Sequence, residues 1–172
     1  MQSQNNSYKI ALRGILIATS MILSWLESLI PAFIALPGIK VGLTNIVVLI
    51  AIYKLSCKDA FIINIIRIIL TGITFGNTFS LLYSFAGGVL STSVMILLKK
   101  TGRFGITNIS MAGGLCHNIG QILMAMLILE STAILYYLPV LWFSGIIAGI
   151  FIGLLSNLIL TRLPLFRNEQ NS

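Results

Sequence analysis

Charged residues are scarce in this chain of 172 residues, because Asp, Glu, Lys and Arg together make up only 9% of it. Soluble domains usually carry about 25% charged residues, so a chain this poor in charge cannot cover a surface that faces water. Hydrophobic residues make up 57% of the sequence, and the mean hydropathy is +1.00. The composition therefore predicts an integral membrane protein and excludes a soluble domain.

Acidic residues are the rarest charged class, and the four of them are scattered along the chain: Glu27, Asp59, Glu130 and Glu169. No Asp-rich pair is therefore available to hold the Mg²⁺ ions that a diphosphate-handling enzyme needs. The single histidine argues against a clustered zinc site. The sequence also lacks a Walker A loop and a convincing set of nucleophile, base and acid. We therefore expect a binding protein rather than an enzyme, without a cofactor or a metal.

Cysteine is also rare. Cys57 and Cys116 lie in different apolar stretches without zinc or redox spacing, so we interpret both as small apolar residues. The polar N-terminal stretch MQSQNNSY leads into an apolar run without an Ala-x-Ala-type cleavage site, so we expect no removable signal peptide.

Long apolar runs divide the chain into segments that are suited to crossing a bilayer, which takes about 20 residues per helix. Pro31 and Pro37 interrupt the chain after the first run, and Glu130 and Pro139 divide the last one. The second and third runs are short. The pattern predicts an all-α integral membrane protein, a single domain over residues 1–172, with six transmembrane helices at about 10–30, 42–55, 59–75, 79–98, 107–129 and 136–161.

Basic residues gather at the ends of alternate segments. With a cytoplasmic N-terminus, the inner ends hold nine of the eleven Lys and Arg residues: Lys9, Arg13, Lys54, Lys58, Lys99, Lys100, Arg103, Arg162 and Arg167. The outer loops hold only Lys40. Cytoplasmic loops carry an excess of Lys and Arg, so six spans with both termini cytoplasmic explain the net charge of +7. No nucleic-acid partner is needed to account for it.

Arg67 lies in the middle of the third apolar run, where an arginine costs about 2.5–3.5 kcal/mol on insertion scales. It must therefore face the interior of the helix bundle or water. Two interpretations stay open: Arg67 forms a buried pair that fixes helix packing, or it faces a ligand. Asn64, Arg67 and Thr71 follow helical spacing and make one polar stripe.

Further polar residues recur in four other parts of the chain. We predict that they converge with the stripe on a pocket that opens outward, because several unpaired polar groups would be unstable in lipid. Each also has an ordinary interpretation as a core residue, an interhelical hydrogen bonder or a boundary marker. The predicted ligand-binding residues are Glu27, Lys40, Asn45, Asn64, Arg67, Asn77, Ser80, Tyr83, His117, Asn118 and Gln121. The excess of basic groups favours a ligand with a carboxylate or phosphate.

Small residues form further patterns. Gly145, Gly149 and Gly153 repeat every four positions, which favours close helix packing. Ala11, Gly14 and Ala18 make a small face on the first segment. That face packs internally or docks another membrane protein.

Four stretches, LSWLESLIP, PGIKVGLTNIVVLIAIY, IIRIILTGITFGNTFSLLYSFAGG and HNIGQ, closely resemble a bacterial family called Gx transporters, also known as heptaprenyl diphosphate synthase component I. The resemblance covers about residues 9–161. The family is similar to the substrate-binding S components of energy-coupling factor (ECF) transporters, which are small six-helix proteins. It implies residence in the bacterial cytoplasmic membrane, a pocket near the outer face with the first loop as a lid, and a coupling subunit with ATPases.

The resemblance places Lys40 and Asn45 at this lid and the start of the second segment. S components often dock through Ala-x-x-x-Ala on the first helix, whereas Gly14 and Ala18 give Gly-x-x-x-Ala here. The leading hypothesis is therefore a subunit that captures a small anionic, vitamin-like or prenyl-linked molecule for import. The alternatives are a non-catalytic membrane subunit that works with a soluble prenyl synthase, and a structural subunit of a membrane redox complex.

Overall fold

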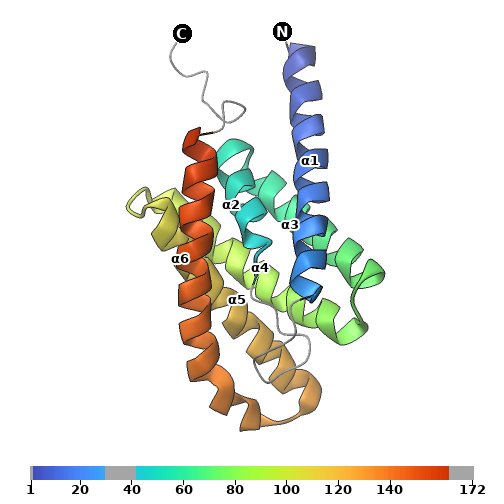
Figure 1. Ribbon diagram of the computed structural model, residues 1–172, viewed down its shortest axis with the longest axis vertical. Coiled ribbons are helices and arrows are strands. Elements are labelled where there is room, and N and C mark those ends of the chain that lie inside the picture. The colour runs from blue at the N-terminus through green and yellow to red at the C-terminus, as the bar shows by residue number, and fades with distance from the viewer. Residues whose placement is uncertain (1, 30–41, 163–172) are drawn as a thin grey trace.

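The computed structural model describes residues 2–29 and 42–162, and within these ranges the protein is helical and has no strand (Figure 1). One short 3₁₀ helix accompanies the α-helices. In chain order the elements are α1 (Gln2–Leu29), α2 (Asn45–Lys54), α3 (Cys57–Thr74), α4 (Thr78–Thr101), α5 (Ile106–Leu129), η1 (Thr132–Tyr137) and α6 (Leu138–Arg162).

Four stretches of the described chain are long and apolar enough to cross a membrane: Ser7–Leu29, Thr78–Thr101, Ile106–Leu129 and Thr132–Arg162. The protein is therefore a multi-pass membrane protein, as its composition predicts. The helix α3 has 18 residues, and it carries three charged residues, Lys58, Asp59 and Arg67. The predicted runs coincide with helices along the chain, whereas the crossing of all six stays a prediction.

The helix α2 is shorter than the run at 42–55 suggests. Its ten residues extend about 15 Å, which is half the thickness of a hydrocarbon core. It begins late because residues 42–44 form a turn, in which Gly42 has a φ of +88° and its carbonyl accepts a hydrogen bond from Asn45 N. It ends at Lys54 because the next residue leaves helical geometry and Ser56 caps α3.

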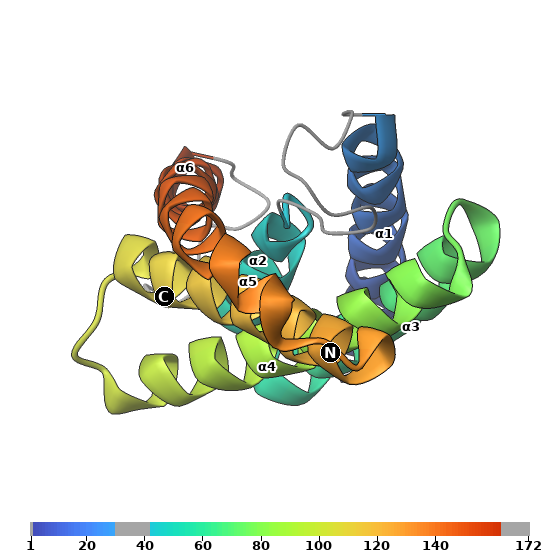
Figure 2. The same cartoon turned by 90° about the horizontal axis from the view of Figure 1, so that it is seen from below.

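The helix α2 lies among the other α-helices and contacts all five of them (Figure 2). Its residues from Asn45 to Ile52 are all buried. A helix that is apolar all round belongs in the interior of a protein or in lipid, and α2 takes the first of these positions. In Figure 2, α6 lies to the left of α2 and α1 lies to its right, and α3, α4 and α5 run below these three helices.

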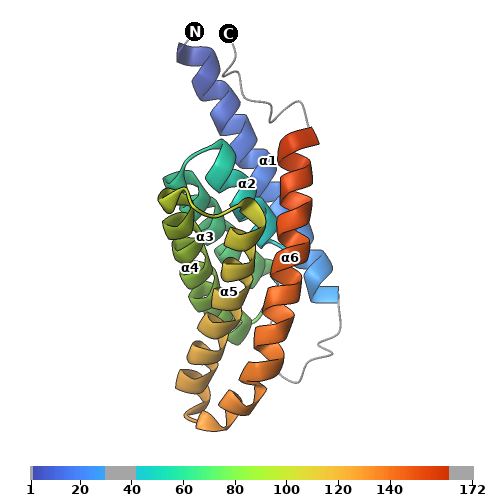
Figure 3. The same cartoon turned by 90° about the vertical axis from the view of Figure 1, so that its left-hand side faces the viewer.

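Glycines allow α5 and α6 to approach closely along their length (Figure 3). A Cβ atom on Gly149 would lie 2.6 Å from Met111 Cα, and one on Gly153 would lie 2.7 Å from Thr107 Cα. The glycines that repeat every four positions thus form an internal packing face, as their spacing predicts.

The described basic residues other than Arg67 lie toward the end of the molecule where α1 begins and α6 ends (Figure 1). Two contacts tie this end together. Arg13 Nη2 lies 2.7 Å from Asp59 Oδ1, which joins α1 to the start of α3. Lys99 Nζ lies 5.2 Å from the centre of the Tyr53 ring and donates to Ile52 O, which joins the ends of α4 and α2.

Candidate binding site

The polar stripe of α3 faces the interior of the bundle. Asn64, Arg67 and Thr71 are all buried, and Arg67 is only 3% exposed. Arg67 Nε donates to Asn64 Oδ1 at 2.9 Å. Asn64 Nδ2 in turn donates to Thr92 Oγ1 at 2.8 Å and to Gly88 O at 3.0 Å. The stripe therefore connects α3 to α4 and holds the guanidinium of Arg67 in a fixed place.

Glu27 brings a negative charge to Arg67. Its side chain is buried near the end of α1, and its carboxylate interacts electrostatically with Arg67. The same carboxylate accepts a hydrogen bond from the backbone N of Gly42, in the turn before α2. Glu27 thus links α1 to the start of α2, and its negative charge acts on the guanidinium of Arg67 from α1.

His117 and Gln121 add the α5 side of this region. A Cβ atom on Gly87 of α4 would lie 3.1 Å from His117 Nδ1 and 2.9 Å from Gln121 Cγ. A Cβ atom on Gly42 would lie 3.5 Å from His117 Cδ2 and 3.2 Å from Asn45 Nδ2. The imidazole of His117 therefore lies between α4 and the turn before α2, where Asn45 begins that helix.

These residues form one group, which we call the polar cluster: Glu27, Asn45, Asn64, Arg67, His117 and Gln121. Two side-chain amides of the cluster lack hydrogen bonds to the described residues. Both side-chain polar atoms of Asn45 and of Gln121 are buried and lack a hydrogen-bond partner in the described part of the chain. Arg67 Nη2 also lacks one within residues 2–29 and 42–162. The cluster therefore keeps donors and acceptors that its own members do not satisfy.

Residues 16–159 match the family model described as heptaprenyl diphosphate synthase component I. The chain belongs to the heptaprenyl diphosphate synthase component I family. The resemblance predicted from the four sequence stretches is thereby confirmed. Every residue of the polar cluster lies within the matched range of this component I chain. Comparison with curated proteins and with solved structures gave no significant match.

Other predicted site residues of the component I chain make contacts with residues outside the polar cluster. Asn118 turns toward α6 and donates through Nδ2 to Leu141 O at 2.6 Å. Asn77 is exposed and caps α4, because its Oδ1 accepts from Ser80 N at 2.8 Å. Tyr83 packs in an apolar group with Ile122. Asn77, Ser80, Tyr83 and Asn118 as ligand contacts stay predictions.

Two predicted features concern the outside of this component I chain. Lys40 and the lid proposed over 31–41 lie outside the described residues. Ala11, Gly14 and Ala18 are exposed on α1, on the side away from the buried Leu12 and Leu16. A Cβ atom on Gly14 would meet nothing within 4 Å among the described residues. The small face of α1 is therefore open to a partner or to lipid.

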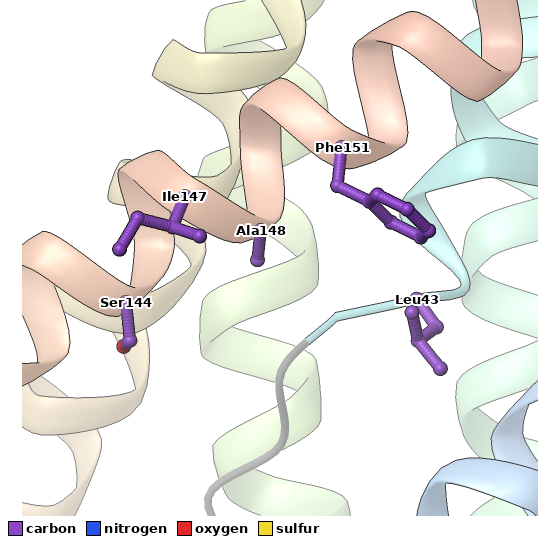
Figure 4. A pocket seen from close by; sticks show the side chains of 5 residues that line it. All are labelled: Leu43, Ser144, Ile147, Ala148 and Phe151. Atoms are coloured by element: carbon purple, nitrogen blue, oxygen red, sulfur yellow. The ribbon is translucent and has the colours of Figure 1, made fainter.

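Sequence reasoning missed an apolar pocket of about 380 Å³ in this family member (Figure 4). Leu43, from the turn before α2, lines one side, and residues of α6 line the other: Ser144, Ile147, Ala148 and Phe151. No polar pattern marks these positions in the sequence. Gly42 and Thr92 were also missed, although Thr92 follows Gly88 by one helical turn and therefore lies on the same side of α4.

Proposed function

We propose that this protein is a membrane-embedded substrate-binding subunit, comparable to the S component of an ECF transporter, for uptake of a small anionic molecule. The polar cluster is the observation that supports this best. A buried polar group without a partner costs about 1–3 kcal/mol. A protein that needed the cluster only for packing would gain stability by replacing Asn45 and Gln121 with apolar residues.

The unsatisfied hydrogen-bond donors of the cluster favour an anion. Arg67 offers Nη2, and the start of α2 brings the positive end of a helix dipole to the same place. In transporters, short helices whose N-termini point at an anionic group are a recurring arrangement. In this proposal Arg67 and Lys40 hold the negative group, whereas Asn45, His117 and Gln121 set its orientation.

The distribution of basic residues supports a cytoplasmic position for both termini. All described Lys and Arg residues other than Arg67 lie toward one end, and that end faces the cytoplasm under the positive-inside rule. We propose the bacterial cytoplasmic membrane as the location. The cluster then receives its ligand from the outer side.

The small face of α1 is the proposed docking surface for a transmembrane coupling subunit that works with ATPases. Gly14 and Ala18 are exposed there and allow another helix to approach closely. Because position 15 is Ile, the face departs from the Ala-x-x-x-Ala pattern.

The family description favours one second candidate, a non-catalytic membrane component of heptaprenyl diphosphate synthesis. A soluble subunit would then supply the Asp-rich Mg²⁺ site. Affinity purification from the native membrane separates the two candidates. A coupling subunit and ATPases in the eluate support uptake, whereas a soluble, Asp-rich synthase supports the second candidate.

Native mass spectrometry of the detergent-purified protein tests the binding role. We expect the parent protein to retain a small anionic molecule that is lost from Arg67→Ala and from Asn45→Leu. The second variant removes hydrogen-bonding atoms while keeping side-chain size. Asn157→Leu is the matched control, because Asn157 is exposed on α6 away from the cluster. Equal occupancy in all four proteins, or none in any, would contradict the proposal.

A further inference from the structure

The polar cluster and the apolar pocket meet at the turn before α2. The backbone N of Gly42 donates to the carboxylate of Glu27, which belongs to the cluster. The next residue, Leu43, lines the apolar pocket. Two successive residues of one turn therefore face two chemically different sites, and Figure 4 shows Leu43 opposite the pocket-lining residues of α6.

A second connection runs through α5. His117 lies against Gly42 and Gly87 in the cluster. Its neighbour Asn118 points to α6, where Nδ2 donates to Leu141 O and lies 3.4 Å from Ser144 Oγ. Among the described residues that line the pocket, Ser144 is the one with a polar side chain. The cluster and the pocket are therefore adjacent at two independent places, at the turn before α2 and along α5.

The two sites differ in what they can bind. The cluster offers a guanidinium and two unsatisfied amides, which suit a polar or charged head group. The pocket offers aliphatic and aromatic carbon from Leu43, Ala148 and Phe151, with a volume within the usual range for small-molecule sites. A wholly polar ligand would gain nothing from such walls.

We propose that the cluster and the pocket hold one amphiphilic ligand, with its anionic head in the cluster and an aliphatic chain in the pocket. This inference rests on the proposed binding function and specifies the class of its ligand. An aliphatic chain is the occupant because Leu43 follows Gly42 directly, which places the apolar pocket next to the head-group site. A bilayer lipid that fills the pocket without using the cluster is the competing outcome.

A series of alkyl phosphates from ethyl to hexyl phosphate tests the inference on the detergent-purified protein. Each is used below the concentration at which it forms micelles, and its dissociation constant is measured from thermal stabilisation. We expect affinity to rise by up to about fourfold per added methylene until the pocket is full. Asn45→Leu should weaken binding of every member of the series.

Pocket variants locate the chain. Ala148→Phe fills the pocket, so it should bind ethyl phosphate as the parent does and lose the gain with chain length. Phe151→Ala enlarges the pocket and should move the best chain length upward. Leu154→Phe is the control, because Leu154 is exposed on α6 and does not line the pocket. It should behave as the parent.

Four results would count against the inference. A parent protein that binds ethyl phosphate with no dependence on chain length would overturn the chain site and leave the proposed function standing. A dependence that survives in Ala148→Phe would also overturn it. A dependence of affinity on chain length that is unaffected by Asn45→Leu would show that the pocket binds an alkyl chain without the cluster, as it would bind a bilayer lipid. No stabilisation by any phosphate would overturn the inference together with the anion-binding role.

Discussion

Among the described residues, Asn64 and Glu27 interact with Arg67, and only one of these two contacts can be predicted from the sequence. Asn64 lies one helical turn away and accepts from Arg67 Nε, so spacing alone predicts the contact. Glu27 comes from another helix, and its interaction with Arg67 depends on how α1 packs on α3. Helical periodicity places residues on one face, whereas it carries no information about which face of another helix lies opposite. The sequence alone therefore could not decide between the two interpretations of Arg67, a buried pair that fixes helix packing or a contact to a ligand.

At the residue scale we predict strong coupling between Glu27 and Arg67. Glu27→Gln and Arg67→Met should each lower the free energy of unfolding by about 3–5 kcal/mol, because each leaves one buried charge without its counterpart. The double variant should lose clearly less than the sum of the two. Unfolding in detergent, analysed as a double-mutant cycle, measures this. Strictly additive losses would show that the two side chains do not interact.

At the scale of the element, the packing of α6 could be predicted from the sequence, whereas the environment of α2 could not. The glycines of α6 follow a four-residue period, which predicted a close-packing face, and they lie against α5. The apolar run of α2 also predicted a membrane span, which stays a prediction, and its residues from Asn45 to Ile52 are buried among other helices. Hydropathy records that a segment avoids water, and it does not distinguish a protein environment from a lipid one. The turn at residues 42–44 further shortened the helix.

Substitution of a packing glycine provides the prediction at this scale. Gly149→Ala should destabilise the protein by about 1–3 kcal/mol, because its new methyl would meet backbone atoms of α5 that cannot move aside. Gly14→Ala is the matched control, since that helical position is open and alanine favours a helix. Thermal unfolding of both variants in detergent measures the difference. Equal stability would contradict close α5–α6 packing.

At the scale of the whole molecule, charge and polarity were predictable in different degrees. The basic residues mark one end because membrane orientation depends on a sum over many positions, which tolerates local errors. The polar cluster was predicted in part, since buried polar side chains stand out in apolar helices. The apolar pocket was not predicted. Its lining comes from α6 and the turn before α2, and each residue resembles any lipid-facing position.

Thiol labelling tests the orientation of the molecule. In a variant without Cys57 and Cys116, a cysteine is introduced by Thr101→Cys or by Thr132→Cys. Both threonines are exposed, at the end of α4 and at the start of η1. A membrane-impermeant maleimide should label Thr132→Cys in intact cells, and Thr101→Cys only after permeabilisation. The reverse pattern would invert the topology and place the basic end outside.

The enclosure of α2 has a consequence for how the protein is made. At about 15 Å this helix is too short to remain across a bilayer by itself after it leaves the insertion machinery. Its buried surface must be received by α3, α4, α5 and α6, all of which are synthesised later. The centre of the molecule is thus completed last, although it is encoded early, and the polar cluster beside it lacks His117 and Gln121 until α5 has arrived.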